Sequence, residues 1–341
     1  MTFFNFSQKL VLDPKMINVL IVGAGAVGSA YGSRMALNVG KVSVSLVCRS
    51  NYQIVAKSGI QMRTHLWGDY IFVPSNVYKS VQDAKESGIL FDHVIVTTKC
   101  LESSRTAEII KPVVTPNTMI HLIQNGIMIE DDVQQSFPDN SVASGVTYIA
   151  ASQVSPGVVK LQGSVQRLFT GLFQASDNAH LKLKEFVELL KLQGMDVHGP
   201  MVEIQEMRWH KLLWNGENLL NLGSFNPVSI LAGEKNSLEL LQYPLTNGLI
   251  RDMMAEIQEV AEFVLGRKFA IDLDTVDQYL DRSLLLGEYK PSMLLDWQGN
   301  RPLETEAILG NMIRIAKNKS FGMPICSAVY ALLKLKSRAQ A

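Results

Sequence analysis

The sequence predicts an α/β protein in which a doubly wound, Rossmann-type sheet domain is followed by an all-α C-terminal domain. Three observations predict this class. A glycine-rich turn lies between a strand-like run and a helix-like stretch near the N-terminus. Strand-like and helix-like segments alternate from Met16 to about Leu122, which is the doubly wound pattern. Beyond Gly199-Pro200, almost every segment has helical periodicity and strand signals are absent.

The glycine-rich turn is the most informative of these features. The apolar run Val19-Leu-Ile-Val22 precedes glycines at positions 23, 25 and 28, which is the G-x-G-x-x-G spacing. A strand that ends in such a turn and feeds a helix presents backbone N–H groups to a pyrophosphate. The alternative is a glycine-rich turn of some other α/β protein, but the strand before it and the helix after it favour dinucleotide binding. The candidate cofactor-binding residues are Gly23, Ala24, Gly25, Ala26, Val27 and Gly28.

The end of the second predicted strand, Lys41 to Val47, indicates which dinucleotide is bound. An NAD enzyme usually has Asp or Glu there to bind the ribose 2′-hydroxyl. This chain instead continues Cys48-Arg-Ser-Asn51, with no acid to repel a 2′-phosphate. Arg49 offers a charged fork that suits such a phosphate. The alternative is a surface arginine, but its position favours NADP(H).

Length and composition limit the other possibilities. The 341 residues suggest two domains, which we place at 16–200 and 201–341 after an N-terminal extension over 1–15. Equal numbers of acidic and basic residues, 32 of each, give no electrostatic case for nucleic acid or an anionic membrane. Three isolated cysteines indicate neither a disulfide framework nor a metal site. We expect a cytoplasmic enzyme, and a homodimer is compatible with a sequence that does not decide the oligomeric state.

The remaining elements follow from periodicity and breakers. Strands are expected at 93–98 and 118–123, and a helix is expected at 102–110 before Pro112. Short β-branched runs at 142–149, 157–161 and 166–172 suggest antiparallel additions to the sheet. Helices are expected at 179–192, 204–222, 238–265, 275–285, 304–320 and 328–337.

Two further loops follow predicted strands at the edge where doubly wound sheets bind ligands. The first contains Lys99, which could meet a phosphate or carboxylate, and the second contains Asn125, which could bind ribose or the carboxamide region. Read alone, they are a solvated lysine and an ordinary turn. In the helical part, Lys211 and Asn215 lie four apart on one helix face. A lysine acting as general acid with amides and hydroxyls to hold the substrate would suit carbonyl reduction, although each could be a solvated surface residue.

A resemblance adds to this reading. Over roughly residues 16 to 335, the chain resembles the ketopantoate reductase (2-dehydropantoate 2-reductase) family. The matching segments, in order, are Gly23-Ala-Gly-Ala-Val-Gly28, Arg49, Thr98-Lys99, Gln124-Asn-Gly126, Ser155-Pro-Gly157, Trp209-x-Lys211-Leu, Asn226-Pro227, Lys290-Pro-Ser-Met-Leu294 and Arg301-Pro-x-Glu304. The glycine loop is generic, whereas the last two segments are specific to the family.

The resemblance implies an NADPH-dependent reduction of a small 2-keto acid to an (R)-2-hydroxy acid, with ketopantoate to pantoate, a step of pantothenate biosynthesis, as the leading case. It implies Lys211 as general acid with Glu304 beside it at the cofactor. It also implies that Asn215 and Ser292 contact substrate, and that Lys99 and Asn125 lie at the cofactor–substrate junction. The alternatives are an (R)-2-hydroxy acid dehydrogenase for a bulkier keto acid, and a catalytically weak NADP(H)-binding sensor or interaction protein.

The chain departs from the family pattern in two places. The usual second amide, eight residues after the lysine, is Leu219, and the Asn-Pro pair arrives only at Asn226, as if seven residues had been inserted at 217–223. A helix extended by two turns would move Asn226 about 10 Å further from Lys211 and leave Asn218 to replace it. A bulge would keep Asn226 in place, which we favour. Second, Leu309 stands where the family usually has Asn.

Overall fold

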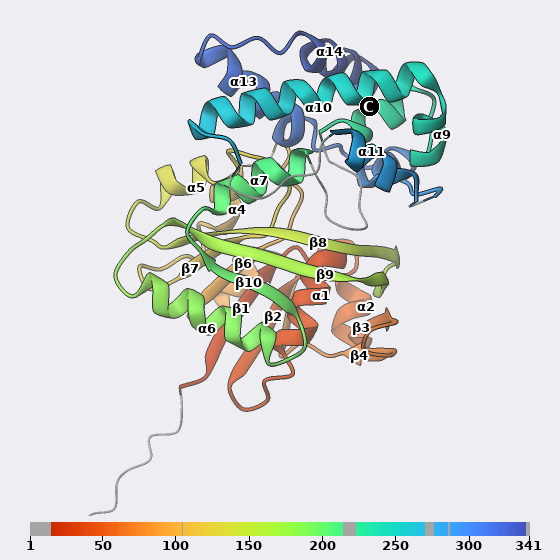
Figure 1. Cartoon of the computed structure of the whole chain (residues 1–341). Coiled ribbons are helices and arrows are strands. Elements are labelled where there is room, and N and C mark those ends of the chain that lie inside the picture. The colour runs from red at the N-terminus through yellow and green to blue at the C-terminus, as the bar shows by residue number, and fades with distance from the viewer. Residues whose placement is uncertain (1–14, 104, 214–222, 270–275, 286, 339–341) are drawn as a thin grey trace, which may run out of the picture.

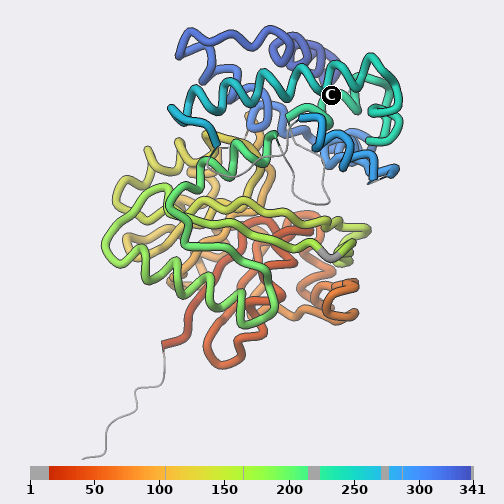
Figure 2. The backbone as a smooth tube through the Cα atoms, in the orientation of Figure 1, coloured from red at the N-terminus to blue at the C-terminus, as the bar shows by residue number. Residues whose placement is uncertain are grey.

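A computed structural model describes residues 15–103, 105–213, 223–269, 276–285 and 287–338. The N-terminal part is one large sheet with helices on its faces, and the C-terminal part is a helical layer stacked against it (Figure 1). The backbone trace in Figure 2 shows the same two layers, joined by the chain that leaves the last strand and enters the first helix of the upper layer. Among the described helices, none combines the length and apolar character that a membrane crossing requires.

The sheet has the strand order β4-β3-β9-β8-β7-β6-β1-β2-β5, and β10 pairs with β9. The pairs β1·β2, β1·β6, β6·β7 and β7·β8 are parallel, as the doubly wound pattern predicts. The strands are β1 (Ile17–Val22), β2 (Val42–Val47), β3 (Ile60–Thr64), β4 (Tyr70–Phe72), β5 (Asn76–Tyr78), β6 (His93–Val96), β7 (Met119–Leu122), β8 (Val142–Ser155), β9 (Val158–Gln174) and β10 (Asp196–Met201).

Six helices cover the sheet: α1 (Ala26–Met35), α2 (Tyr52–Ser58), α3 (Val81–Glu86), α4 (Thr106–Ile110), α5 (Asp131–Ser136) and α6 (Ala179–Lys191). The upper layer contains α7 (Ile204–Leu213), α8 (Phe225–Leu231), α9 (Ser237–Gln242), α10 (Pro244–Leu265), α11 (Val276–Leu284), α12 (Ser292–Gln298), the π-helix η1 (Glu306–Gly310), α13 (Asn311–Asn318) and α14 (Pro324–Arg338). Separate apolar cores fill the two faces of the sheet and the helical layer. The mixed sheet and the helical layer confirm the predicted fold class.

Several predicted elements need correction. The three short β-runs after residue 141 form only two long strands, β8 and β9, because the breakers inside them are absorbed as register shifts. Of the two, β8 is antiparallel to β9 but parallel to β7, so the addition is only partly antiparallel. The predicted helix at 238–265 is two helices, since Pro244 fixes the start of α10. Helices α8 and α12 were not predicted, and α4 begins only at Thr106.

Candidate active site

The glycine loop has the geometry that its spacing predicts. Gly23 has a φ of +110°, and a Cβ there would lie 2.7 Å from the backbone nitrogen of Thr98. A Cβ on Gly28 would lie 2.3 Å from the carbonyl oxygen of Gly23, so the helix can approach the strand only through a glycine. Gly25 has open space above it, with no heavy atom within 4 Å of a Cβ position. The loop therefore needs glycine at both ends and leaves its middle open to a ligand.

A cleft of about 640 Å³ opens in front of this loop. It is bounded by the glycine loop, the ends of β2 and β5, the segment after β6, and Arg301 from the helical layer. Four of its lining residues are basic, namely Arg49, Lys79, Lys99 and Arg301, and none of the described lining residues is acidic. Neither Arg49 nor Lys79 forms an ion pair with any residue in the described ranges. The cleft thus suits a ligand that carries several phosphates.

A second group of side chains joins the two layers beside this cleft. Lys211, near the end of α7, donates from Nζ to Asn125 Oδ1 at 2.8 Å and to the Thr147 carbonyl oxygen at 2.5 Å. Asn125 in turn donates from Nδ2 to Glu304 Oε2 at 3.3 Å. Glu304 also accepts the N–H of Cys100 at 3.1 Å. Lys211, Asn125 and Glu304, three of the residues predicted from the sequence, are therefore brought into one hydrogen-bonded chain.

Burial sets the protonation properties of this chain. Lys211 is only 7% exposed, and its ammonium lies 5.5 Å from the ring centroid of Tyr148. The pKa of Lys211 is lowered to about 7, mainly by burial and in part by the positive charge of Arg208, while the charge of Glu304 opposes the shift. Burial likewise raises the pKa of Glu304, against the hydrogen bonds from Cys100 and Asn125. A lysine with a pKa near 7 exchanges its proton at neutral pH, which is what a general acid needs.

Lys99 lies at the junction of the two layers, but it is already engaged. Its Nζ forms an ion pair with Asp296 Oδ1 at 2.7 Å and donates to the carbonyl oxygen of Pro302 at 3.1 Å. Arg301 reaches the same Asp296 oxygen at 3.0 Å. Lys99 therefore holds the rim of the cleft against the helical layer, and a ligand in the cleft would share this lysine with Asp296.

Asn226 binds the start of the helix that carries Ser292. Its Oδ1 accepts the N–H of Met293 at 2.7 Å and the hydroxyl of Ser292 at 3.4 Å, so it binds the first turn of α12. Asn226 therefore orients Ser292, the other predicted substrate residue. Asn215, Asn218 and Leu219 lie outside the described residues.

Gly223, the last residue of the predicted insertion, lies close to the end of α7. Its N–H donates to the Leu212 carbonyl oxygen at 3.1 Å, beside the last turn of α7. Eleven further helical residues would instead separate these two positions by about 16 Å. Of the predicted helix at 204–222, residues 204–213 form α7 and residues 214–222 lie outside the described ranges, while Asn226 follows close to α7.

The second departure from the family pattern falls in the π-helix η1. Leu309 is buried there, while Asn311, two residues later, donates to the Ile127 carbonyl oxygen at 2.6 Å. Ile127 also donates its own N–H to Ala307 at 3.1 Å. A π-helix adds a residue to one turn and changes which side chains face a neighbour. Here an amide of the helical layer binds the loop that follows Asn125.

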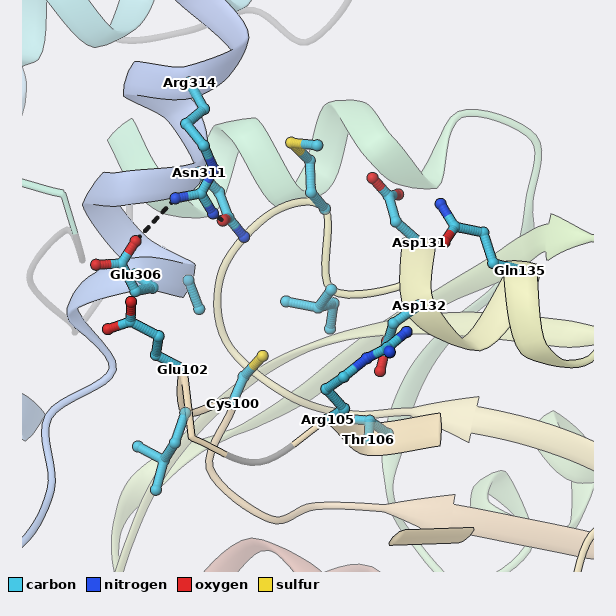
Figure 3. Close-up of a pocket in the computed structure, with 14 residues that line it drawn as sticks. Cys100, Glu102, Arg105, Thr106, Asp131, Asp132, Gln135, Glu306, Asn311 and Arg314 are labelled. Carbon is cyan, nitrogen blue, oxygen red and sulfur yellow. Dashed lines mark hydrogen bonds and ion pairs between the residues drawn. The ribbon is translucent and has the colours of Figure 1, made fainter. Parts of the chain in front are cut away.

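A second cavity, of about 390 Å³, lies between η1, α13 and the loops after β6 and β7 (Figure 3). Leu101 lines both cavities, so the segment after Lys99 separates them. The charged residues that line the second cavity are largely paired with other charged side chains or with the backbone. Glu306 binds Arg314 at 2.9 Å and Lys334 at 3.0 Å, and Asp132 accepts the N–H of Ala107. Neither Lys211 nor Asn125 lines it. Elsewhere in the described ranges, no group of acidic, histidine and cysteine side chains could hold a metal ion.

Sequence reasoning missed several residues of this region. Asn51 donates to the Ala24 carbonyl oxygen at 3.0 Å and fixes the glycine loop. Lys79 lines the cleft from the end of β5, and its Nζ lies 5.3 Å from the Tyr52 ring centroid. Thr147 of β8 accepts a hydrogen bond from Lys211, and Arg208 of α7 donates to the Gln124 carbonyl oxygen next to Asn125. Only Asn51 carried a signal, through its place just after the second strand.

Comparisons with known proteins agree with this architecture. The family model described as ketopantoate reductase PanE/ApbA matches residues 19–174, and the model of the C-terminal part of the same family matches residues 203–337. The crystal structure of 2-dehydropantoate 2-reductase from Methylococcus capsulatus is 32% identical, with a TM-score of 0.81 over 95% of this chain and 98% of that chain.

Two curated relatives extend the comparison. The 2-dehydropantoate 2-reductase of Nostoc is 24% identical over 92% of this chain and 93% of that protein. The Saccharomyces cerevisiae protein YDL144C is 28% identical over 95% of this chain and 96% of its own length. The two family models together span most of the chain, and the conclusion is direct: this chain belongs to the ketopantoate reductase family of oxidoreductases.

Proposed function

We propose that this protein reduces a 2-keto acid to an (R)-2-hydroxy acid with NADPH, and that 2-dehydropantoate, which gives pantoate, is its first candidate substrate. The observation that carries the proposal is the buried Lys211, whose ammonium is held by Asn125 and Thr147. Asn125 links it to Glu304, which binds the N–H of Cys100 between the cleft residues Lys99 and Leu101. Family membership supports the reaction class, and the names of the reductases from Methylococcus and Nostoc support the substrate.

The residues of the first cleft fit a nicotinamide dinucleotide. The open space above Gly25 would admit the pyrophosphate to the N-terminus of α1, where backbone N–H groups and the helix dipole favour anions. Arg49 and Lys79 would face a 2′-phosphate from two neighbouring strand ends, and the lack of acid among the described lining residues removes the usual partner of an NAD ribose. These features support NADPH over NADH.

When bound, NADPH supplies the hydride for the carbonyl carbon of the substrate. Lys211 acts on the other end of that bond, since its ammonium would donate a proton to the carbonyl oxygen as negative charge develops there. Asn125 holds the ammonium of Lys211 in place. The negative charge of Glu304 raises the pKa of Lys211 against the effect of burial, which favours the protonated form. Ser292, oriented by Asn226, would hold the substrate from the start of α12.

One observation favours a second substrate class. Leu309 replaces the family's usual amide and is buried in η1, while the side chain of the nearby Asn311 donates to the Ile127 carbonyl oxygen. A substrate pocket with one amide fewer suits a bulkier or aromatic 2-keto acid better than a polar one. The fold is also that of D-mandelate dehydrogenase, with a TM-score of 0.78 at 21% identity.

The test is an NADPH-oxidation assay across a panel of 2-keto acids that includes ketopantoate and aromatic members, repeated with NADH. The proposal expects turnover of at least one member, preference for NADPH, and an (R)-product on a chiral column. Ketopantoate as the best substrate would support the first candidate, and an aromatic acid would support the second. Cofactor binding without turnover of any member would contradict the enzyme function and support the sensor alternative.

We also propose a cytoplasmic homodimer. The dimeric ketopantoate reductase of Staphylococcus aureus, a structural neighbour at 20% identity, supplies the precedent for the dimer alone. Light scattering of the purified full chain tests the dimer, because a monomer and a dimer of 37.8 kDa chains differ twofold in mass. Fractionation of the source cells tests the location.

A further inference from the structure

Arg208 is the most completely bonded charged side chain near the catalytic cluster. It lies on α7 one turn before Lys211, and it is 3% exposed. Its Nε donates to Glu130 Oε1 and Ser144 Oγ at 2.7 Å each, its Nη1 donates to the Gln124 and Gly126 carbonyl oxygens at 2.9 and 3.0 Å, and its Nη2 donates to the Leu122 and Gly145 carbonyl oxygens at 3.2 and 3.4 Å. Every nitrogen of the guanidinium is used.

The two bonds from Nη1 are the informative ones. Gln124 and Gly126 are the residues on either side of Asn125. One nitrogen of Arg208 therefore donates hydrogen bonds to the backbone both before and after the asparagine. The loop is confined on its other side as well. Gly126 has a φ of +101°, and a Cβ there would lie 2.3 Å from the Ala307 carbonyl oxygen. Asn125 is therefore held between α7 and η1 with little freedom to turn.

Asn125 is the link in the catalytic chain, because its two side-chain atoms touch Lys211 and Glu304. A rotation of its backbone would break both contacts at once. A lysine in place of Arg208 would keep the cation opposite Glu130, but its single nitrogen cannot replace the three guanidinium nitrogens that donate in fixed directions to Glu130 and Ser144 and to the backbone on both sides of Asn125. The shape of the arginine, as well as its charge, is thus matched to this loop.

We propose that Arg208 is a positioning residue for the reaction proposed above: its guanidinium holds the loop 124–126 so that Asn125 stays between Lys211 and Glu304. The inference rests on the proposed function for its catalytic consequence. Its structural part does not depend on the proposed function and is measured without turnover. This part comprises the hydrogen bonds from Arg208 to the loop and the effect of its charge on the pKa of Lys211.

Arg208 also acts on Lys211 through its charge. The two cations lie on one helix, three residues apart, and the positive charge of Arg208 lowers the pKa of Lys211. Among the other charged groups, Glu304 opposes this effect, and Glu130 pairs with Arg208 itself. Removing the cation of Arg208 together with the charge of Glu130 should therefore raise the pKa of Lys211, whereas Arg208→Lys should leave it nearly unchanged.

The experiment compares Arg208→Lys with the double variant Arg208→Met/Glu130→Gln, which avoids leaving a buried carboxylate unpaired. Arg267→Met is the matched control, since Arg267, which follows α10, forms another arginine–glutamate pair with Glu206 of α7 at 2.7 Å. In each, kcat and the dissociation constant for NADPH are measured first. We expect Arg208→Lys to lower kcat on the order of 10- to 100-fold, with NADPH affinity changed by less than about twofold.

Two readouts do not depend on turnover. Amide hydrogen exchange of residues 124–127 should accelerate in both Arg208 variants and stay unchanged in the control. The pH dependence of Lys211 acetylation by acetic anhydride, followed by mass spectrometry, should shift to higher pH only in the double variant. If the wild type reduces no keto acid, the proposed function fails, but these two readouts still decide the grip and the charge effect.

The contradicting results are equally specific. A folded Arg208→Lys protein with wild-type kcat and wild-type exchange at 124–127 would overturn the proposal. Failure of both Arg208 variants to fold, with the control intact, would show that Arg208 serves the fold as a whole, which also contradicts a role confined to the Asn125 loop.

Discussion

The two halves of the candidate site are built in different ways. The half formed by the glycine loop uses residues close together in the sequence, and its shape depends on backbone geometry at Gly23, Gly25 and Gly28. The half around Lys211 uses residues from four distant segments, joined by direct side-chain hydrogen bonds across the two layers. The first half can tolerate changes that keep the backbone, whereas the second depends on buried charges that have no substitute. Substitutions in the two halves should therefore separate binding from chemistry.

The largest effect is expected at Lys211. Lys211→Ala removes the proposed proton donor and should lower kcat by on the order of 10²-fold or more. Binding of NADPH, measured by fluorescence titration, should survive because the glycine loop is untouched. Lys235→Ala is the control, since Lys235 is an exposed lysine of the helical layer paired with Glu239. A Lys211→Ala enzyme with nearly normal kcat would remove this lysine from the mechanism.

A charge reversal in the other half should affect cofactor choice. Arg49→Asp replaces the proposed partner of the 2′-phosphate with a like charge, so kcat/KM for NADPH should fall by roughly one to two powers of ten more than kcat/KM for NADH. Lys57→Asp makes the same charge change at an exposed site of α2 that does not line the cleft. It should affect both cofactors little. Equal losses with the two cofactors in Arg49→Asp would show that Arg49 does not bind the 2′-phosphate.

Glu304 should be visible in the pH profile. Its negative charge raises the pKa of Lys211, so Glu304→Gln should lower that pKa and move the alkaline limb of kcat/KM for reduction to lower pH. Glu306→Gln is the control, because Glu306 pairs with Arg314 and Lys334 in the second cavity. An alkaline limb that stays in place in Glu304→Gln would mean that Glu304 does not act on Lys211.

The smallest expected effect concerns Asn226. Asn226→Ala leaves the buried N–H of Met293 without its acceptor, which should cost about 1–3 kcal/mol in the free energy of unfolding. It should also slow turnover more than Asn218→Ala, since Ser292 loses its orienting partner. Urea unfolding and steady-state kinetics of both variants test this. The opposite ranking in turnover would assign the missing amide to Asn218 instead.

The two halves also differ in how well the sequence predicts them. The strand, turn and helix around Gly23–Gly28 were predictable because local spacing determines them, and so were the ends of β2, β6 and β7. Lys211, Asn125 and Glu304 were singled out largely through the resemblance. Their mutual contacts were not predictable, because they join residues 86 and 179 positions apart.

Arg208 shows the limit most clearly. In the sequence it is one arginine beside a tryptophan, with nothing to mark it as buried. Its partners come from the loops and strands of the other layer, 63 to 86 residues away, and appear only when α7 lies across the end of the sheet. Helix α8 was missed for a different reason: it is short, and Pro227 inside it resembles a breaker although it lies in the first turn.

The pH dependence of the wild-type enzyme in both directions tests the central claim most directly. If Lys211 is the acid, as proposed, reduction needs its protonated form, and because its pKa is about 7, kcat/KM for keto acid reduction should decline as pH rises through about 7. Oxidation of the hydroxy acid with NADP⁺ needs the neutral amine, so its kcat/KM should rise over the same range. Two limbs of opposite slope that cross near neutrality would support Lys211 as the acid of reduction and the base of oxidation. Profiles that are flat from pH 6 to 8, or that change in the same direction, would contradict it.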